Sequence, residues 1–306
     1  MHGALLSIPS PSINELQLGS VTIRYYALFI LVGIVLGLWL TAVRLKQRGV
    51  KPGVAIDIAI WAVPFGIIGG RVYHVLTHLN DYFAPEVDWT TVFHIWEGGL
   101  AIYGAIIFGA LGAFIGAKMS GIKFLAFADA LAPGILLAQA IGRWGNYFNV
   151  ELFGVPTTLP WGLEVPQNNP AYPTGLPAGV LFHPTFLYES LWDLLGVFVL
   201  IWIGSKFNLQ WGKLFATYLV YYSVGRAFIE SIRIDPAAVV LGLRTNVWSA
   251  ILGIAVGVFL FWYQSRKHPG LEESPFIAAA EVESIDQALA EAPDEAPYQL
   301  ESDKKK

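Results

Sequence analysis

The sequence contains no cysteine and few charged residues. Of its 306 residues, 14% are Asp, Glu, Lys or Arg, whereas 55% are hydrophobic. The absence of cysteine excludes disulfides, thiolate metal ligands and a cysteine nucleophile of this chain. A soluble domain has about a quarter charged residues, and a chain with so few cannot cover an apolar core with a charged surface. The composition therefore indicates a membrane protein.

The apolar residues occur in blocks long enough to cross a bilayer. Helices of about 20 apolar residues match the hydrocarbon thickness, and helices satisfy every backbone polar group internally, as lipid requires. The sequence therefore predicts an all-α integral membrane protein. Seven transmembrane helices are expected, at residues 21–43, 54–77, 95–117, 124–146, 184–204, 212–233 and 246–264.

Lys and Arg gather in alternate connections between these helices. Connections 78–94 and 147–183 contain neither residue, and 234–245 contains only Arg244. The other connections and the end of the last helix are basic, through Arg44, Lys46, Arg48, Lys51, Lys118, Lys123, Lys206, Lys213, Arg266 and Lys267. Basic loops stay in the cytoplasm. We therefore expect the N-terminus outside and the C-terminus in the cytoplasm.

Three regions follow from this topology. Residues 1–20 form an outer N-terminal segment, and residues 21–267 form a seven-helix membrane domain that includes the outer loop 147–183. Residues 268–306 hold ten of the 23 acidic residues, several prolines and three terminal lysines. Such a segment cannot bury enough apolar surface to fold, so it is predicted to be a disordered acidic cytoplasmic tail.

The polar residues of the predicted helices fall mainly at their outer ends. A charged group inside a span is costly and often marks a functional site. Single acids mid-span or toward the cytoplasm (Asp57, Asp129 and Asp193) fit packing roles better. Six spans contribute to the outer set, which comprises Tyr26, Arg71, Glu97, Tyr103, Arg143, Asn146, Glu151, His183, Tyr188, Glu189, Tyr222, Arg226, Glu230 and Arg233.

The sixth span carries its polar residues on one stripe. Tyr222, Arg226, Glu230 and Arg233 are spaced by four, four and three residues, which places them on one helical face. The Arg-Glu-Arg run can neutralise itself, so an ion-paired helix end is the alternative to a binding site, above all for Arg233 near the interface.

Glycine accompanies several of these charges, in Gly142–Gly154, Gly69–Arg71 and Trp96–Gly99. Glycine permits close helix approach and also non-helical backbone at membrane depth where a cavity is lined. The neighbouring Arg and Asn favour the second interpretation. Arginine binds phosphate oxygens through two parallel hydrogen bonds, so the predicted ligand is an anionic lipid headgroup of the outer leaflet.

The segment Gly142–Gly154, GRWGNYFNVELFG, closely resembles the signature of the bacterial prolipoprotein diacylglyceryl transferases. The resemblance covers most of residues 20–265. It includes Tyr26, GGR at 69–71, WEGG at 96–99, HPTFLYE at 183–189 and GRAFIESIR at 225–233. It implies a seven-helix body in the bacterial inner membrane, with sites that open to the periplasm and laterally to lipid.

The resemblance also implies a reaction. The family transfers the diacylglyceryl group of phosphatidylglycerol to the thiol of the lipobox cysteine in a preprolipoprotein, giving a thioether and glycerol 1-phosphate, the first step of lipoprotein maturation. Arg143 and Arg226 would be the principal catalytic or phosphate-binding arginines. Residues of the essential site would be Tyr26, Asn146, Glu151 and Gly154, with Arg71 also toward the lipid. Supporting residues would be Tyr222, Glu230, Arg233, Glu97, His183, Tyr188 and Glu189.

Tyr103 departs from the commoner family pattern, in which a histidine follows WEGG or WDGG and is often assigned as the base. Here the segment reads LAIYGA. A phenol, with a reference pKa of about 10, is a poor acceptor for the proton of a thiol at about 8.5. Either adjacent arginines acidify Tyr103, or it orients the lipid, or another group takes the proton.

Other functions fit the sequence less well. A polytopic anionic-lipid transporter or lipid-binding protein is the main alternative, but a transport path needs polar inner halves, and these are apolar. An intramembrane serine protease needs a serine–histidine pair that the motifs do not provide. His74, His78 and His94 lack a metal-site pattern, so no metal is expected. We also expect no cofactor and no nucleic-acid partner.

Overall fold

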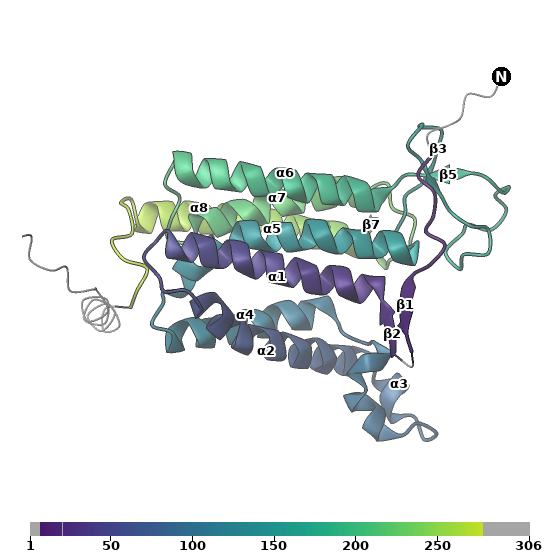
Figure 1. Ribbon diagram of the computed structural model, residues 1–306, viewed down its shortest axis with the longest axis horizontal. Helices are drawn as coiled ribbons and strands as arrows, with labels where there is room; N and C mark the ends of the chain where they lie inside the picture. The colour runs from purple at the N-terminus through teal and green to yellow at the C-terminus, as the bar shows by residue number, and fades with distance from the viewer. Residues whose placement is uncertain (1–6, 20, 278–306) are drawn as a thin grey trace, which may run out of the picture.

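Long helices that run between two ends of the molecule dominate the computed structural model, which describes residues 7–19 and 21–277. The long helices are α1 (Tyr25–Lys46), α2 (Val54–Thr77), α4 (Ile102–Met119), α5 (Phe124–Asn149), α6 (Thr185–Lys206), α7 (Lys213–Glu230) and α8 (Thr245–Lys267). Shorter helical turns are α3 (Leu79–Phe83), η1 (Trp89–Phe93) and η2 (Ile95–Glu97). Figure 1 shows the long helices side by side along the longest axis of the molecule.

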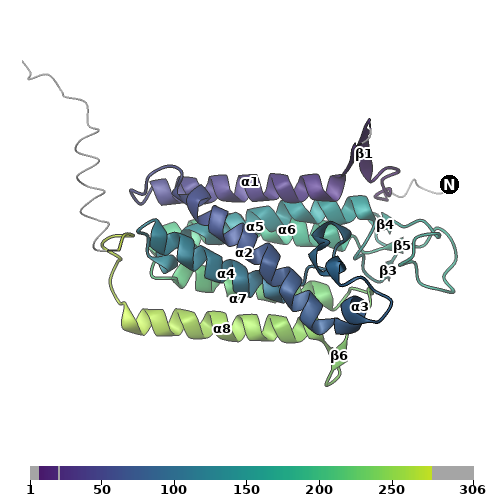
Figure 2. The ribbon, with the colours of Figure 1, turned by 90° about the horizontal axis from the view of Figure 1, so that it is seen from below.

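The connections divide into two sets. The head end, at the right of Figure 1, holds connections 78–101, 150–184 and 231–244, together with the strands. The tail end holds connections 47–53, 120–123 and 207–212 and the segment after α8. Figure 2 shows α1 and α8 at opposite edges of the bundle, with the other long helices between them.

Helix α5 is the central helix of the bundle. Of its apolar stretch, 56% is buried inside the protein, against 11% for α8 at the edge. At the tail end, Leu45, Ile58, Ala117 and Ile122 pack together in one apolar cluster. A second cluster joins α5 to α6 and α7, and includes Leu136, Leu200 and Leu214. Both clusters hold α5 in place and leave its C-terminal turns to face the head end.

Helices α2 and α4 form a close pair through glycine. A Cβ atom at Gly69 would lie 2.6 Å from the Gly104 carbonyl oxygen, and one at Gly112 would lie 2.5 Å from the Trp61 carbonyl oxygen. Small residues permit this approach of two backbones. Gly69 and Gly70 lie inside α2, and Gly142 and Gly145 lie inside α5. The non-helical backbone that the sequence favoured at these glycines is therefore not found.

Six helices among the described residues have the length and apolar composition of membrane spans, namely α1, α2, α4, α5, α6 and α8. The chain is thus a mostly helical integral membrane protein. The expected span 212–233 is a helix too, but α7 carries Lys213, Arg226 and Glu230 within its 18 residues, which lowers its apolar character. The expected span 95–117 begins later, at Ile102, because Gly98 and Gly99 adopt positive φ values and end η2.

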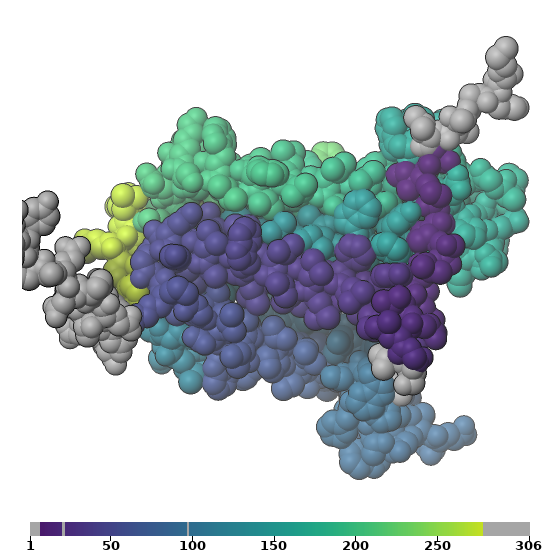
Figure 3. Space-filling model, viewed as in Figure 1, coloured from purple at the N-terminus to yellow at the C-terminus, as the bar shows by residue number. Residues whose placement is uncertain are grey.

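Small antiparallel sheets lie at the head end. β1 (Glu15–Leu18) pairs with β2 (Val21–Arg24), so residues 21–24 of the first expected span form a strand. β3 (Pro156–Thr157), β5 (Leu181–Phe182) and β4 (Leu163–Glu164) form a three-stranded sheet in that order, and β6 (Val239–Val240) pairs with β7 (Leu243–Arg244). The chain from α3 to η2 projects beyond the helices (Figures 1 and 3).

Residues 268–277 pack against the tail end, where the composition predicted a disordered tail from residue 268. The fully buried Glu272 side chain pairs with Arg48 and lies 3.7 Å from Lys123. The Lys123 and Ile277 amides donate to the Pro275 and Gly121 carbonyls, both over 2.8 Å. We call residues 268–277 the tail strap. The remainder of the expected tail, 278–306, lies outside the described residues.

Candidate active site

Glu189 joins two arginines from neighbouring helices at the head end. It lies in the second turn of α6 and is 6% exposed. One carboxylate oxygen lies 2.5 Å from Arg143 Nε of α5 in an ion pair, and the other accepts from Arg226 Nη1 of α7 over 3.0 Å. The carboxylate therefore fixes both guanidinium groups beside each other, although they lie on different helices.

Glu230 forms the second junction of this network and is completely buried. Its Oε2 lies 2.8 Å from Arg226 Nη2 and 3.9 Å from Arg233 Nε. Its Oε1 accepts from Arg244 Nε over 2.6 Å and from Asn246 Nδ2 over 3.0 Å. Arg226 and Glu230 of the expected stripe are thus paired on α7, whereas Arg233 lies just beyond the end of that helix, and the ion pairs continue into the loop before α8.

Arg233 and Arg244 close the network at its outer edge. Arg233 Nε donates to Asp235 over 2.7 Å, and Arg244 donates to the carbonyls of Arg233 and Asp235 over 3.0 and 2.9 Å. Burial raises the pKa of Asp235, but the hydrogen bond and charge of Arg233 and the charge of Arg244 outweigh it, so the pKa lies below its ordinary value. Asp235 is therefore ionised at neutral pH and holds both arginines.

The network leaves hydrogen-bond donors unused. Arg143 binds Glu189 through Nε only, so its Nη1 and Nη2 have no partner among the described residues. A cavity of about 10 Å³, enough for at most one water molecule, lies beside them. It is lined by Arg143, Glu189, Trp192, Asp193, Tyr222, Gly225, Arg226 and Ile229. Asp193, expected to serve packing, therefore borders the two arginines.

The end of α5 is held by its own polar residues. Asn146 Nδ2 and Asn149 Nδ2 donate to the same Glu151 oxygen, over 2.7 and 3.2 Å. The helix ends at Val150, whose φ of 49° is left-handed. Gly154 then packs tightly, since a Cβ there would lie 2.9 Å from both His183 Cβ and the Ile232 carbonyl oxygen. Glycine is needed at this position to bring loop 150–184 against the chain that follows α7.

Tyr26 and Tyr222 approach the network from two sides. Tyr222 lines the cavity with Arg143 and Arg226. Tyr26, at the start of α1, lies against Gly145, where a Cβ would come within 2.8 Å of the tyrosine ring. Gly145 therefore allows Tyr26 to reach α5 two residues after Arg143.

Tyr103 lies at the start of α4 and bonds to α8. Its hydroxyl is 2.6 Å from Ser249 Oγ, and Ser249 in turn donates to the Thr245 carbonyl. The side chain is 43% exposed and bonds to Ser249 rather than to Arg143 or Arg226. Its hydrogen bond connects α4 to the second turn of α8, one turn after Arg244 and Asn246.

Arg71, on α2, binds the backbone of the chain between α3 and α4. Its guanidinium group donates to the carbonyls of Thr91, Val92, Gly98 and Gly99 over 2.5–3.2 Å. These contacts use all three of its nitrogens and fix the chain between α3 and α4. The expected contact of Arg71 with lipid phosphate therefore has no support in its geometry.

The remaining expected residues lie around the head end. His183 Nδ1 is 3.1 Å from the Tyr188 hydroxyl, which accepts from Trp161 Nε1 over 3.0 Å. Both residues thus fix loop 150–184 to α6. The side chain of Glu97 lies outside the described part of the structure. Among the described residues, no three His, Asp or Glu side chains are grouped so that they could hold a metal ion.

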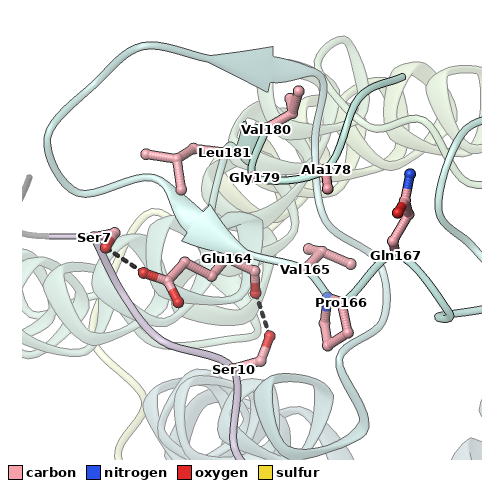
Figure 4. Close-up of a pocket in the computed structure, with 10 residues that line it drawn as sticks. All are labelled: Ser7, Ser10, Glu164, Val165, Pro166, Gln167, Ala178, Gly179, Val180 and Leu181. Carbon is pink, nitrogen blue, oxygen red and sulfur yellow. Dashed lines mark hydrogen bonds between the residues drawn. The ribbon is translucent and has the colours of Figure 1, made fainter. Parts of the chain in front are cut away.

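A larger hollow lies farther out in loop 150–184. Its volume is about 530 Å³, and Figure 4 shows the Ser7 hydroxyl bonded to the Glu164 carboxylate and the Ser10 hydroxyl bonded to the Glu164 carbonyl at its wall. None of its lining residues belongs to the network of Glu189 and Glu230. The arginine network is therefore the better candidate for chemistry.

Comparison with known proteins identifies the family. A family model described as prolipoprotein diacylglyceryl transferase matches residues 14–263. The chain belongs to this family. It is 49% identical over 292 residues to a phosphatidylglycerol–prolipoprotein diacylglyceryl transferase of Leifsonia xyli, an alignment that covers 92% of this chain and 87% of that protein. A protein of the same name from Paenarthrobacter aurescens is 51% identical over 262 residues, with coverages of 83% and 82%.

The sequence analysis did not place Arg244, Asp235 or Asn246 in this network, and Arg244 is the one for which a signal existed. It lies in a loop, so helix spacing could not place it beside Glu230. A signal was present, because Arg244 is the single basic residue in the three connections otherwise free of Lys and Arg. A lone cation on that side of a membrane protein calls for an explanation, and its pairing with Glu230 and Asp235 provides one.

Proposed function

We propose that this member of the diacylglyceryl transferase family moves the diacylglyceryl group of phosphatidylglycerol to the lipobox cysteine thiol of a preprolipoprotein. The products are a thioether and glycerol 1-phosphate. The observation that carries the proposal is the Glu189 bridge, which sets Arg143 and Arg226 side by side with unused donors on Arg143. Relatives that carry the transferase name cover most of the chain.

The proposal assigns the charge stabilisation to the two arginines. The substrate sulfur attacks the glycerol carbon that carries the phosphate, a C–S bond forms, and the C–O bond breaks with its electron pair on the phosphate oxygen. Negative charge therefore grows on the leaving phosphate monoester. Arg143 and Arg226, already oriented by Glu189, stabilise that charge without reorganisation. The guanidinium fork suits phosphate because it donates two parallel hydrogen bonds.

The other residues of the site support this pair. Tyr222 borders the arginines, and Tyr26 lies against Gly145, two residues after Arg143; both would orient the lipid. Asn146, Glu151 and Gly154 fix the end of α5 on which Arg143 lies. Tyr103 would donate a hydrogen bond at the edge of the site. The net reaction releases the thiol proton to solvent, because the phosphate monoester product carries one more negative charge than the phosphodiester.

We further propose a membrane arrangement. In it α7 is the seventh span, the head end faces the periplasm, and the tail end lies in the cytoplasm of a bacterial inner membrane. Residues 1–20 and 147–183 would then be periplasmic, 21–267 would form the catalytic domain, and the acidic tail would be cytoplasmic. The absence of Lys and Arg from 78–94 and 147–183 supports this orientation.

The direct test uses purified protein, phosphatidylglycerol and a lipobox peptide. The expected result is a peptide whose mass rises by one diacylglyceryl group, with release of glycerol 1-phosphate. A Cys→Ser peptide and phosphatidylethanolamine serve as controls and should give no product. Binding of phosphatidylglycerol without modification of the peptide would favour the alternative of a lipid-binding or lipid-transporting protein.

A further inference from the structure

A polar cavity lies at the tail end, on the opposite side of the bundle from the Arg143 network. Its volume is about 200 Å³, and it is enclosed by the end of α1, the start of α5 and the connection between α6 and α7. Asp129 borders it, fourteen residues before Arg143 on α5, so the two sites are about 20 Å apart along the helix. The lining residues are Arg44, Gln47, Arg48, Asp129, Ala130, Gly204, Ser205, Asn208, Leu209 and Gln210.

One cation of this cavity lacks a hydrogen-bond partner. Arg44 Nε is buried and has no partner among the described residues. A buried polar atom is normally satisfied by protein, by water or by an ion. Arg48, by contrast, is paired with Glu272. Arg44 is therefore the cation that the surrounding protein does not satisfy.

The acidic groups nearby are already bound. Both oxygens of Asp129 accept backbone amides at the start of α7, from Gly212 over 2.7 Å and from Phe215 over 2.9 Å. The positive end of the α7 dipole stabilises that carboxylate further. Glu272 binds Arg48 and lies near Lys123. Neither acid makes a contact with Arg44 within ion-pair distance.

The rest of the lining offers hydrogen-bond donors. Gln210 uses its side-chain oxygen to accept from the Glu272 amide, so its NH₂ group remains available. Gln47, Ser205 and Asn208 are exposed at the opening and have no side-chain partner among the described residues. Two guanidinium groups and several donors around one cavity match a ligand with many acceptor oxygens.

We propose that this cavity is a second anion site, which binds a phosphate group at the tail end through Arg44. The phosphate can belong to an anionic lipid headgroup of the adjacent leaflet or to a free phosphate ion, since the chemistry of recognition is the same. The site is separate from the transfer reaction, and the proposal does not depend on it. A bound phosphate would join α1, α5 and the connection before α7.

The test measures thermal unfolding of the purified full chain in the presence of two probes. Inorganic phosphate is titrated into protein in phosphate-free non-ionic detergent, and phosphatidic acid is added to phosphatidylcholine nanodiscs that hold the protein. A ligand that binds the folded state raises the melting temperature as its concentration passes the dissociation constant. We expect at least one probe to raise it, and Arg44→Gln to weaken the apparent affinity at least tenfold.

Two variants locate the effect. Arg266→Gln removes an exposed arginine from the last turn of α8 at the same end, and Arg226→Gln removes one from the head-end network. Arg266→Gln should keep the wild-type response to the probes, and Arg226→Gln should keep the part of the response that Arg44→Gln removes. If Arg44→Gln does not fold, Arg44→Lys keeps the charge without the fork and should weaken affinity several-fold.

The probes also separate the two sources of phosphate. A response to phosphatidic acid alone identifies a lipid headgroup, and a response to inorganic phosphate alone identifies a free ion. The proposal is overturned if wild type responds to neither probe, or if the Arg44 variants respond as wild type does. It is also overturned if the response disappears in Arg226→Gln but persists in Arg44→Gln, because the ligand would then bind at the head end.

Discussion

The two ends of the bundle use the same residue types for different purposes. At the head end, Glu189 and Glu230 form ion pairs with the side chains of Arg143, Arg226 and Arg244. At the tail end, Asp129 accepts backbone amides of α7, and Glu272 belongs to the tail strap. Head-end carboxylates therefore orient guanidinium groups, whereas tail-end carboxylates hold helix starts and loops. The same pairing of Arg with acid thus carries the proposed chemistry at one end and joins connections at the other.

The largest expected effect is loss of a head-end arginine. Arg226→Ala and Arg143→Ala should each reduce transfer to a lipobox peptide at least a hundredfold, since a charge-assisted contact in a dry site contributes about 3 kcal/mol to the transition state. Lysine should rescue poorly because a point charge cannot replace the fork. The measurement is kcat/KM by peptide mass, with membrane abundance as the control. Full activity in either alanine variant would contradict the phosphate-site assignment.

The matched change at the tail end should affect stability instead. Glu272→Ala leaves Arg48 without its partner and should lower the free energy of unfolding by about 2 kcal/mol, while transfer at 25 °C stays within about twofold of wild type. Thermal unfolding and peptide transfer are measured on the same preparation. Glu273, its neighbour in the tail strap, provides the control Glu273→Ala. A severe loss of kcat without loss of stability would remove the distinction between the two ends.

A change at Arg244 tests the head-end network indirectly, because Arg244 pairs with Glu230, which in turn pairs with Arg226. Arg244→Ala should lower kcat about tenfold, or about 1.4 kcal/mol, with little change in KM, because Arg226 loses part of its orientation. Arg244→Lys should recover part of the loss. A KM effect as large as the kcat effect would show that Arg244 contacts the lipid directly, and no effect on either would show that Glu230 is fixed without it.

The smallest effect is expected at the α4–α8 contact. Tyr103→Phe should retain measurable transfer and lose about 1 kcal/mol for one hydrogen bond. Ser249→Ala should have a similar effect, and the double variant should add little if both report the same bond. The rate is followed from pH 6 to 9 with Tyr103→His alongside. If Tyr103→Phe is inactive throughout while Tyr103→His is active with its profile moved to lower pH, the phenol is the base.

Helix positions were predictable from apolar length alone, as the span 54–77 shows, since α2 has those bounds. The start of α4 could not be predicted in this way, because it depends on the positive φ values of Gly98 and Gly99, which hydropathy does not report. At the site, spacing placed Arg226, Glu230 and Arg233 on one stripe. Their bonds to Glu189 and Arg244 depend on how α6 and the loop before α8 pack against α7.

The tail strap shows a further limit. An acidic composition predicts disorder because it takes no account of partners elsewhere in the chain. Glu272 has such a partner, Arg48, which lies 224 residues away. Arg71 is a similar case, since a buried arginine beside glycines suggested a ligand. Its four carbonyl acceptors belong to a loop whose path the sequence does not reveal.

The position of the tail strap also bears on biogenesis. A ribosome delivers the chain from its N-terminus, so residues 268–277 emerge after all the helices have been made. Their contacts with Arg48, Lys123 and Gln210 can form only when those three connections already lie together at one membrane face. A nascent chain with a misplaced helix would present Glu272 with no cation to bind. The strap can therefore dock only after these three connections have come together.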